Sequence, residues 1–390
     1  MPVEIKKPYF KEGYSMKKLL SLLLVLSLAL CAASAFADVP ADIEAGSAMS
    51  HDELVEKAKA ETGKFIVAGN TSRIADAADA FAALYGIETE SNNMKDQEIY
   101  EKLESTTIDM VMIQDGANLL DHIDAGKLYN FVPAEVKDAI PESDREPALV
   151  HQFINKLFIY NNKGDNVPAI KNVWELTDPA MKGNVIFKNP TTEKVNMNFL
   201  IMLTNDDWSA KLAEAYKAWK GEDIDLGEYK NAGYKWIAEF LDNVTFIKSD
   251  TTIAEEVSQD TAAGKIGLFV LSKLRSSSVL SDNLTVAQYD ATANGYTVEP
   301  FAGFMYPMYV MIPAVSQRPY TAMLFIEYLM SQEGFQPWGK SIGAYSPNPA
   351  IAPKEGDLGL DVWKANLVIE DPSYILDSIE VEDFINLHCQ

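Results

Sequence analysis

The chain has 390 residues, of which 47% are hydrophobic, and its formal net charge at pH 7 is −24. Such an excess of acidic residues argues against nucleic acid and anionic lipid as partners. The two cysteines, Cys31 and Cys389, lie near opposite ends of the sequence, so we expect no disulfide in the body of the protein. Its stability must then come from a large hydrophobic core, which a chain of this length can form.

Residues 16–37 have the pattern of an export signal. Lys17 and Lys18 precede an uncharged apolar run over residues 19–30, and Ala35–Ala37 offers the small-x-small pattern that signal peptidase cleaves. The run is shorter than the ~20 residues that a membrane-spanning helix needs. The pattern therefore predicts an exported protein, located in the periplasm or outside the cell.

The residues that precede the export pattern fit no part of it, so we expect Met16 rather than Met1 to be the natural start. The first 37 residues carry five lysines and two glutamates, and their removal leaves 353 residues with a net charge of −27. That length suggests two domains of about 150 residues each. Cys31 has an alternative interpretation as a lipidated cysteine, because Leu28–Cys31 resembles a lipobox.

Apolar runs of strand length alternate with helical patterns along the rest of the chain. This alternation is typical of an α/β protein with parallel strands covered by helices on both faces. The predicted strands, each with the helix that follows it where one is expected, are 64–68 with 74–85, 108–113 with 117–125, 185–188 with 196–203, and 265–271.

The turns that leave these strands are rich in polar side chains. In open α/β sheets, ligands bind at the carboxyl ends of the strands, where helix N-termini also present free N–H groups. Serine, threonine, asparagine and aspartate also cap helices, so a purely structural role remains open for each residue. The candidate ligand-binding residues in these turns are Asn70, Thr71, Ser72, Gln114, Asp115, Thr191, Thr192, Ser272 and Lys273.

No set of residues in the sequence forms a recognisable catalytic site. The four histidines lack metal-ligand spacing, and neither a Walker A motif nor a G-x-G-x-x-G motif is present, so we expect no metal site and no cofactor. Residues 339–343 match the G-x-S-x-G pattern of a hydrolase nucleophile at Ser341, but they follow a predicted helix, 320–330, rather than a strand. The sequence favours a binding protein, with a secreted serine hydrolase as the alternative.

Several segments resemble the solute-binding proteins of ABC importers. Residues 157–161 are similar to the strand, ending in Tyr-Asn, that enters the second lobe of these proteins. Residues 174–183 resemble their W-x-x-L-x-D-P-x-x-K-G segment, residues 264–271 their returning strand, and residues 318–334 their late helix. The order and spacing of these segments identify the chain as similar to family 1 of these proteins.

The resemblance implies a two-lobe periplasmic-binding-protein fold of type II, with a hinge and a ligand cleft between the lobes. Residues 1–37 would form the N-terminal extension and signal peptide. The first lobe would hold residues 38–154 and 275–345, and the second lobe residues 155–274 and 346–390. A hinge lets contacts from both lobes stabilise a closed state around the ligand.

Within this superfamily the chain is most similar to the group of ferric-ion, polyamine, thiamine and sugar-phosphate binders. Ferric-ion binders place two adjacent tyrosines just after the returning strand, where this sequence has Leu274 and Arg275. Lys273 and Arg275 beside Ser272 instead suit an anionic or phosphorylated ligand. Tyr306 lies where an aromatic side chain of the cleft is expected, and it also fits a core position.

We therefore expect the substrate-binding component of an ABC importer. It would be a monomer that captures a small polar, anionic solute outside the cytoplasmic membrane and delivers it to the permease. Two further interpretations stay open beside the hydrolase: a binding protein for free or chelated ferric iron, and a ligand sensor that presents its closed form to a receptor.

Overall fold

The computed structural model describes residues 38–104, 107–164, 170–287 and 298–389. Residues 39–390 group into one compact unit. The predicted export signal and Cys31 lie outside the described residues, as does part of the polar connection expected at 161–168. Within the described ranges, no helix is both long and apolar enough to cross a lipid bilayer.

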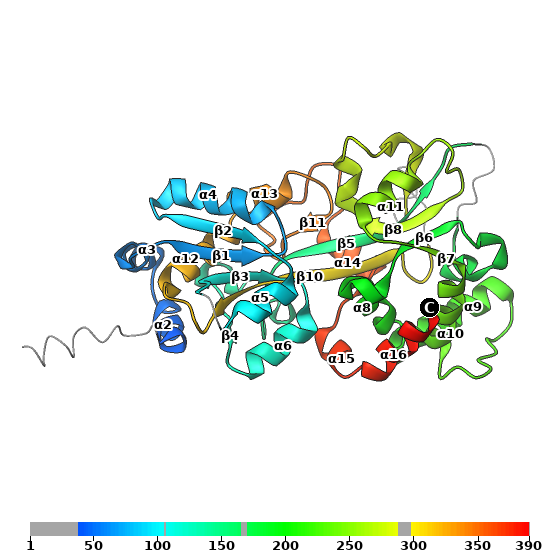
Figure 1. Ribbon diagram of the computed structural model, residues 1–390, viewed down its shortest axis with the longest axis horizontal. Helices are drawn as coiled ribbons and strands as arrows, with labels where there is room; N and C mark the ends of the chain where they lie inside the picture. Colours follow the sequence, from blue (N-terminus) through cyan, green and yellow to red (C-terminus); the bar gives the residue numbers. More distant parts are fainter. Residues whose placement is uncertain (1–37, 105–106, 165–169, 288–297, 390) are drawn as a thin grey trace, which may run out of the picture. The chain divides into compact units, whose positions relative to one another are not determined.

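The strands of the described residues form one mixed sheet in the order β2-β1-β3-β10-β5-β8-β6-β7 (Figure 1). Along the chain these strands are β1 (Phe65–Gly69), β2 (Thr89–Asn93), β3 (Met110–Ile113), β5 (Leu149–Asn161), β6 (Val185–Lys188), β7 (Val244–Ile247), β8 (Ile266–Val270) and β10 (Gly303–Pro313). Four short strands pair beside this path: β4 (Leu128–Tyr129), β9 (Leu284–Val286), β11 (Ala344–Tyr345) and β12 (Val368–Ile369).

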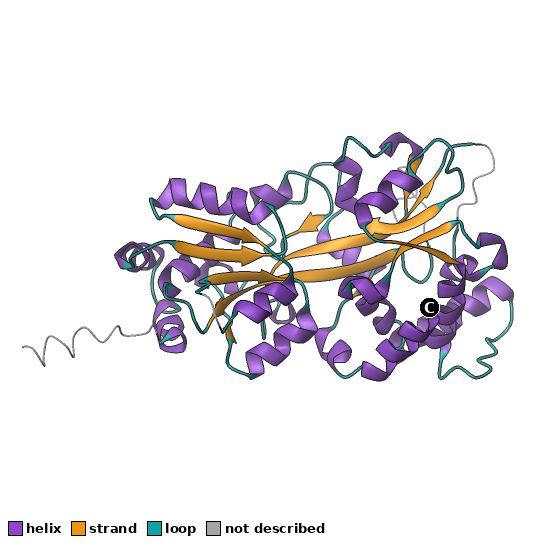
Figure 2. Ribbon diagram, viewed as in Figure 1, coloured by secondary structure: helices purple, strands orange, loops and turns teal. Residues whose placement is uncertain are grey.

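Helices cover the sheet and connect its strands (Figure 2). In the first part of the chain they are α2 (Val39–Gly46), α3 (His51–Ala60), α4 (Arg73–Tyr85), α5 (Asp96–Lys102), α6 (Gly116–Asp124) and α7 (Ala134–Lys137). In the middle they are α8 (Lys194–Met202), α9 (Asp206–Lys220), α10 (Ala232–Asn243) and α11 (Asp250–Val257). Towards the end they are α12 (Pro319–Leu329), α13 (Gln336–Gly339), α14 (Leu360–Asn366), α15 (Pro372–Leu376) and α16 (Ile379–His388).

Two long strands, β5 and β10, run antiparallel and join two groups of shorter strands. The C-terminal part of β10 pairs with β3, and through it with β1 and β2, which we call the first half-sheet. The C-terminal part of β5 pairs with β8, and through it with β6 and β7, which we call the second half-sheet. The register between the two long strands shifts at Met308, in the stretch that links the half-sheets.

The register also determines which strand ends face each other. Ile113, at the carboxyl end of β3, lies opposite Tyr309, on the side of β10 nearer to the second half-sheet. Val270, at the carboxyl end of β8, lies opposite Lys156, on the side of β5 nearer to the first half-sheet. Because the neighbouring strands are parallel to β3 and β8, the carboxyl ends of both half-sheets meet in one region, which we call the junction.

The four predicted strands are confirmed with small shifts at their ends. The helix expected over 74–85 is confirmed as α4, and it ends at Gly86, whose φ of 73° is the left-handed conformation that glycine adopts most easily. The helices expected over 117–125 and 196–203 are confirmed as α6 and α8. Local patterning was sufficient here because each element carries its own apolar face and terminal signals.

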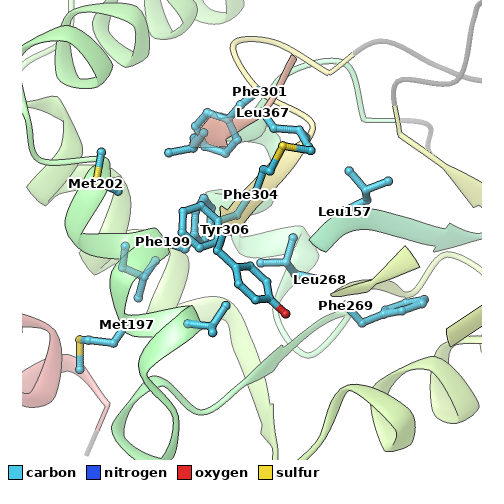
Figure 3. Packing of buried hydrophobic residues seen from close by; sticks show 14 of the residues in the cluster. Leu157, Met197, Phe199, Met202, Leu268, Phe269, Phe301, Phe304, Tyr306 and Leu367 are labelled. Carbon is cyan, nitrogen blue, oxygen red and sulfur yellow. The ribbon is translucent and has the colours of Figure 1, made fainter. Parts of the chain in front are cut away.

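A core of aromatic side chains fixes α8 against β10. The ring of Phe199 on α8 packs 5.5 Å from that of Phe304 and 5.7 Å from that of Phe301. Figure 3 shows these rings beside Tyr306, which is only 4% exposed and stacks on Phe304. Buried aromatic rings of this size contribute several kcal/mol each, about 3–5 when a phenylalanine is cut back to alanine. This packing holds the N-terminal residues of α8 at the junction.

The strand pairing bears on the expected lobe limits. β9, together with the beginning of β10 up to Pro307, pairs with residues 153–161 of β5. These segments lie between residues 284 and 307, which the resemblance assigns to the first lobe. The pairing instead associates them with the part of β5 that carries the second half-sheet. The limits of the lobes remain a prediction.

Candidate ligand-binding site

The junction is lined on one side by basic residues. Ser272, Lys273 and Arg275 line a cavity of about 390 Å³, together with Thr251, Ser276 and Ser277. The bases come from η5 (Leu271–Arg275), the turn that directly follows β8. Of the predicted site residues, these three are brought together, and two of them are cationic.

Arg73 lies at the start of α4, the helix that follows β1 of the first half-sheet. It adds a third cation to the basic side of the junction. Burial, and to a smaller extent the charge of Arg275, lower the pKa of Arg73 to about 10, against an opposing effect of Asp76. The pKa of Lys273 is also lowered, by burial first and then by Arg275, Lys188 and Arg73, against an opposing effect of Asp250. These mutual effects on pKa show that the three bases are close enough to influence one another. We call Arg73, Lys273 and Arg275 the cationic side.

Hydrogen bonds hold Arg73 in place. Its Nη2 donates to the hydroxyl of Ser341 at 2.9 Å and its Nη1 to the carbonyl oxygen of Trp338 at 3.2 Å. Ser341 therefore serves here as an acceptor for a base, in a segment between α13 and β11 rather than at a strand-to-helix turn. A nucleophile of the G-x-S-x-G type requires the strand-to-helix turn.

Buried ion pairs lie between this side and the long strands. Lys156 on β5 is 1% exposed, and its Nζ lies 3.2 Å from Asp250 Oδ1 and 3.7 Å from Glu193 Oε1, while it donates to Asn196 Oδ1 at 2.6 Å. Burial alone would lower the pKa of Lys156, but the two carboxylates outweigh it and raise that pKa. Lys188 lies 3.6 Å from Glu193 Oε2 and 3.7 Å from Asp250 Oδ2. The four charges form one network.

The other side of the junction is acidic and buried. Glu370, just beyond β12, is 6% exposed, and burial raises its pKa to about 8, with further contributions from Asp115, Glu193 and Asp96. Asp96 at the start of α5 is 7% exposed, and burial raises its pKa to about 7. Glu370 Oε2 accepts a hydrogen bond from Asn198 Nδ2 at 3.1 Å. We call Glu370, Asp96 and Asp115 the acidic side.

Tyr306 lies within electrostatic reach of both the buried ion pairs and the acidic side. Burial raises the pKa of its hydroxyl, and the charges of Asp250, Glu193, Glu370 and Asp96 raise it further, in that order. Asp250 belongs to the buried ion pairs, whereas Glu370 belongs to the acidic side.

The remaining predicted residues have local partners. Asp115 caps α6, accepting from the Asn118 backbone N–H at 3.3 Å, and the backbone N–H groups of Gln114 and Asp115 donate to Asp96 Oδ2 at 3.1 and 2.9 Å. The hydroxyl of Thr71 accepts from the Arg73 backbone N–H at 3.2 Å.

In the second half-sheet, the hydroxyls of Thr191 and Thr192 both donate to Asn189 and are exposed. Asn70 is half-buried and Ser72 exposed in the turn after β1. The contact of Asp115 fits the capping interpretation, whereas Ser72 makes no side-chain capping bond to α4 and the hydroxyls of both threonines donate rather than accept. A role of these residues in binding stays a prediction.

Several residues of the junction were not predicted from the sequence. They are Arg73, Asp96, Lys156, Lys188, Glu193, Asp250 and Glu370. Lys156 had a visible signal, since a lysine inside an apolar strand must find a partner when it is buried.

The sequence matches no protein-family model and no curated protein. Among solved structures, the chain is similar to a ferric binding protein from Campylobacter jejuni, at 15% identity and a TM-score of 0.62, over 83% of this chain and 99% of that one. It is similar to iron-bound HitA from Pseudomonas aeruginosa, at 13% identity and a TM-score of 0.63, over 84% of this chain and all of that one.

A third similar structure is that of an ABC transporter from Clostridium perfringens, at 13% identity and a TM-score of 0.58, over 84% of this chain and 100% of that one. At such identities the likeness shows the fold. The chain has the two-lobe α/β fold of periplasmic binding proteins, and the predicted fold class is confirmed.

Proposed function

We propose that the protein is the substrate-binding component of an ABC importer, and that it captures a small anionic solute outside the cytoplasmic membrane for delivery to a permease. One observation carries the anionic assignment: Lys273 and Arg275, which follow β8, line one cavity, and Arg73, which follows β1, lies within electrostatic reach of both. Charge-assisted hydrogen bonds from such bases suit carboxylates and phosphates.

Capture would couple ligand binding to closure of two lobes. The two half-sheets are linked by β5 and β10, so a bend in these strands changes the distance between Arg73 and Arg275. A ligand that contacts both lobes stabilises the closed state by its differential affinity for that state. The closed form would be the one that the permease recognises, and the same form would serve a receptor if the protein is a sensor.

A thermal-shift screen of the protein without residues 1–37 tests this function. The probes are sugar phosphates, organic acids, polyamines, thiamine and ferric citrate. A ligand present at a hundred times its dissociation constant stabilises a protein by ~2.7 kcal/mol. We expect stabilisation by at least one anionic probe and its loss in Arg275→Gln. A response to none of the anions would contradict the anionic assignment.

Ferric iron is the second candidate ligand, because two of the similar structures are described as a ferric binding protein and as iron-bound. Binding of iron by phenolates would give the protein a visible colour. If ferric ion alone stabilised and coloured the protein while every anion failed, the iron interpretation would replace ours.

The protein is proposed to be a binding protein without enzymatic activity. Ester hydrolysis that is abolished in Ser341→Ala would favour the secreted hydrolase instead. A permease and an ATPase encoded beside this protein would favour transport over a purely sensory role.

A further inference from the structure

The acidic side holds a buried carboxyl group that its protein neighbours do not satisfy. Glu370 Oε2 accepts from Asn198, whereas Glu370 Oε1 is buried and has no hydrogen-bond partner among the described residues. A buried polar atom left without a partner costs about 1–3 kcal/mol. Such an atom either marks a strained position or awaits a donor from a ligand.

The neighbours of Glu370 are themselves acidic and come from separate elements. The charges that act on it are those of Asp115 at the start of α6, Glu193 before α8, and Asp96 on α5. The backbone N–H of Glu370 donates to the carbonyl oxygen of Met305 on β10, which fixes the residue at the junction. Asp96 and Asp115 follow strands of the first half-sheet and Glu193 follows β6 of the second, so carboxyl groups from both halves act on Glu370, and of these Glu193 is paired with Lys156 and Lys188.

The buried ion pairs link the acidic side to the cationic side, because Asp250, which pairs with Lys156 and Lys188, also acts on the pKa of Lys273. Glu193 pairs with Lys156 and Lys188, and its charge also reaches Glu370. Tyr306 feels Asp250 from the buried ion pairs together with Glu370 and Asp96. A small molecule that spans the junction would therefore meet bases at one end and carboxyl groups at the other.

We propose that the ligand is a zwitterion, with an anionic group at Arg73, Lys273 and Arg275 and an ammonium group at Glu370, Asp96 and Asp115. This inference rests on the proposed function and narrows its substrate class. The ammonium N–H groups would supply the donor that Glu370 Oε1 lacks, and its charge would compensate the cluster of carboxyl groups. The anionic group is a phosphate or a carboxylate, two chemistries that the bases bind alike.

Matched pairs of probes test the inference by isothermal titration calorimetry at about pH 8. One series pairs ω-aminoalkyl phosphates of increasing chain length with the alkyl phosphates that lack the amine. A second series pairs ω-amino acids with the corresponding carboxylates. We expect at least one amine-bearing probe to bind about tenfold or more tightly than its matched anion, as one charge-assisted hydrogen bond would produce.

Two variants test which side of the junction binds the amine of the probe and which side binds its anionic group. Glu370→Gln keeps the size of the side chain and an acceptor for Asn198, and it should reduce the preference for the amine-bearing member of the pair to less than about threefold. Arg275→Gln should weaken both members of a pair about equally. Glu355→Gln, on an exposed segment, is the matched control and should leave both affinities unchanged.

Proton release gives an independent readout. An ammonium group bound at Glu370 favours the ionised carboxylate, so the amine-bearing probe should release protons and the matched anion should release none. Titrations in buffers with different ionisation enthalpies measure this difference.

The failures of the two proposals are distinguishable. If the matched anions bind as tightly as the amine-bearing probes, or if Glu370→Gln keeps the full preference, the zwitterion inference is wrong while an anionic solute remains. If amines without an anionic group bind as tightly as the zwitterions, both the inference and the anionic assignment are wrong. If no pair binds at all, the zwitterion inference is wrong, and the wider screen decides the function.

Discussion

The two sides of the junction hold their charges in different ways. On the cationic side, Lys273 is half-buried and Arg275 is exposed at a cavity of about 390 Å³, so both bases keep contact with water. On the acidic side, Glu370 is 6% exposed, and burial keeps its carboxyl group mostly protonated at neutral pH. The first side is ready to receive an anion, whereas on the second side Glu370 becomes charged only when a cation arrives.

Lys156 forms buried ion pairs at the junction, and removing this base gives the largest expected effect. Lys156→Met would leave Asp250 and Glu193 with Lys188 as their remaining partner. Removing one partner of a buried ion pair costs about 3–5 kcal/mol, and we expect the lower end of that range, measured as the free energy of unfolding in urea.

The exposed pair of Lys194 and Glu382 provides the control for this comparison. Lys194→Met should cost less than about 1 kcal/mol, because Lys194 and Glu382 are largely exposed. Adding Asp250→Asn to Lys156→Met should recover part of the stability, since it removes a carboxylate that the first change left poorly compensated. An equal loss in the Lys156 and Lys194 variants would show that the buried network contributes no more than a surface pair.

The buried carboxyl group of Glu370 predicts how the free energy of unfolding depends on pH. Burial raises the pKa of Glu370 from 4.5 to about 8, so the folded state holds this proton more tightly than the unfolded chain. The stability that the protonated group contributes is complete below pH 4.5 and is lost as the pH rises through 8. Glu370→Gln cannot ionise and should become more stable than the natural protein over this window, by on the order of a few kcal/mol.

Urea unfolding of both proteins at about pH 5 and about pH 9 measures this difference, and other titrating groups cancel between them. If the free energies of unfolding of the two proteins differed by the same amount at both pH values, Glu370 would ionise normally and the acidic side would be open to water.

The cationic side predicts a moderate loss of affinity. Arg275→Gln should weaken the tightest anionic probe of the screen roughly tenfold to a hundredfold, as expected for a hydrogen bond to a charged group. Lys354→Gln, on an exposed segment, is the control for a general change in charge. Equal affinities of the two variants, measured by calorimetry, would remove Arg275 from the site.

The smallest effect is expected at Ser341. Its hydroxyl accepts from Arg73 Nη2, so Ser341→Ala should weaken anion binding by about 1 kcal/mol through a less well-oriented Arg73. Ser341→Thr keeps the hydroxyl and should restore the affinity. If neither variant changes anion binding in calorimetry, Arg73 does not depend on Ser341 for its position.

The order of strands and helices was largely predictable because each element carries local signals. The strand over 185–188 and the helix ended by Gly86 needed only apolar spacing and a terminal residue. Lys273 and Arg275 were also predicted from sequence as candidates, since they follow the predicted strand within one turn, and they line the same cavity.

The acidic side was not predictable in the same way. Glu370 reaches the junction only because β12 pairs with β10, with Val368 opposite Phe304, far apart in the sequence. Asp96 starts a short helix whose N-cap residue, Lys95, makes no side-chain capping bond, so no motif distinguishes it. Without long-range pairing, the sequence offered only Asp115 as a carboxylate and favoured a plain anion.

Hydrogen–deuterium exchange with and without the best probe of the screen tests the central claim most directly. The claim is that turns from both half-sheets hold one ligand at the junction. It predicts added protection in both groups of turns, residues 69–73 and 113–116 in the first half-sheet and residues 188–194 and 270–276 in the second. Protection confined to one half-sheet, or located away from these turns, would contradict it.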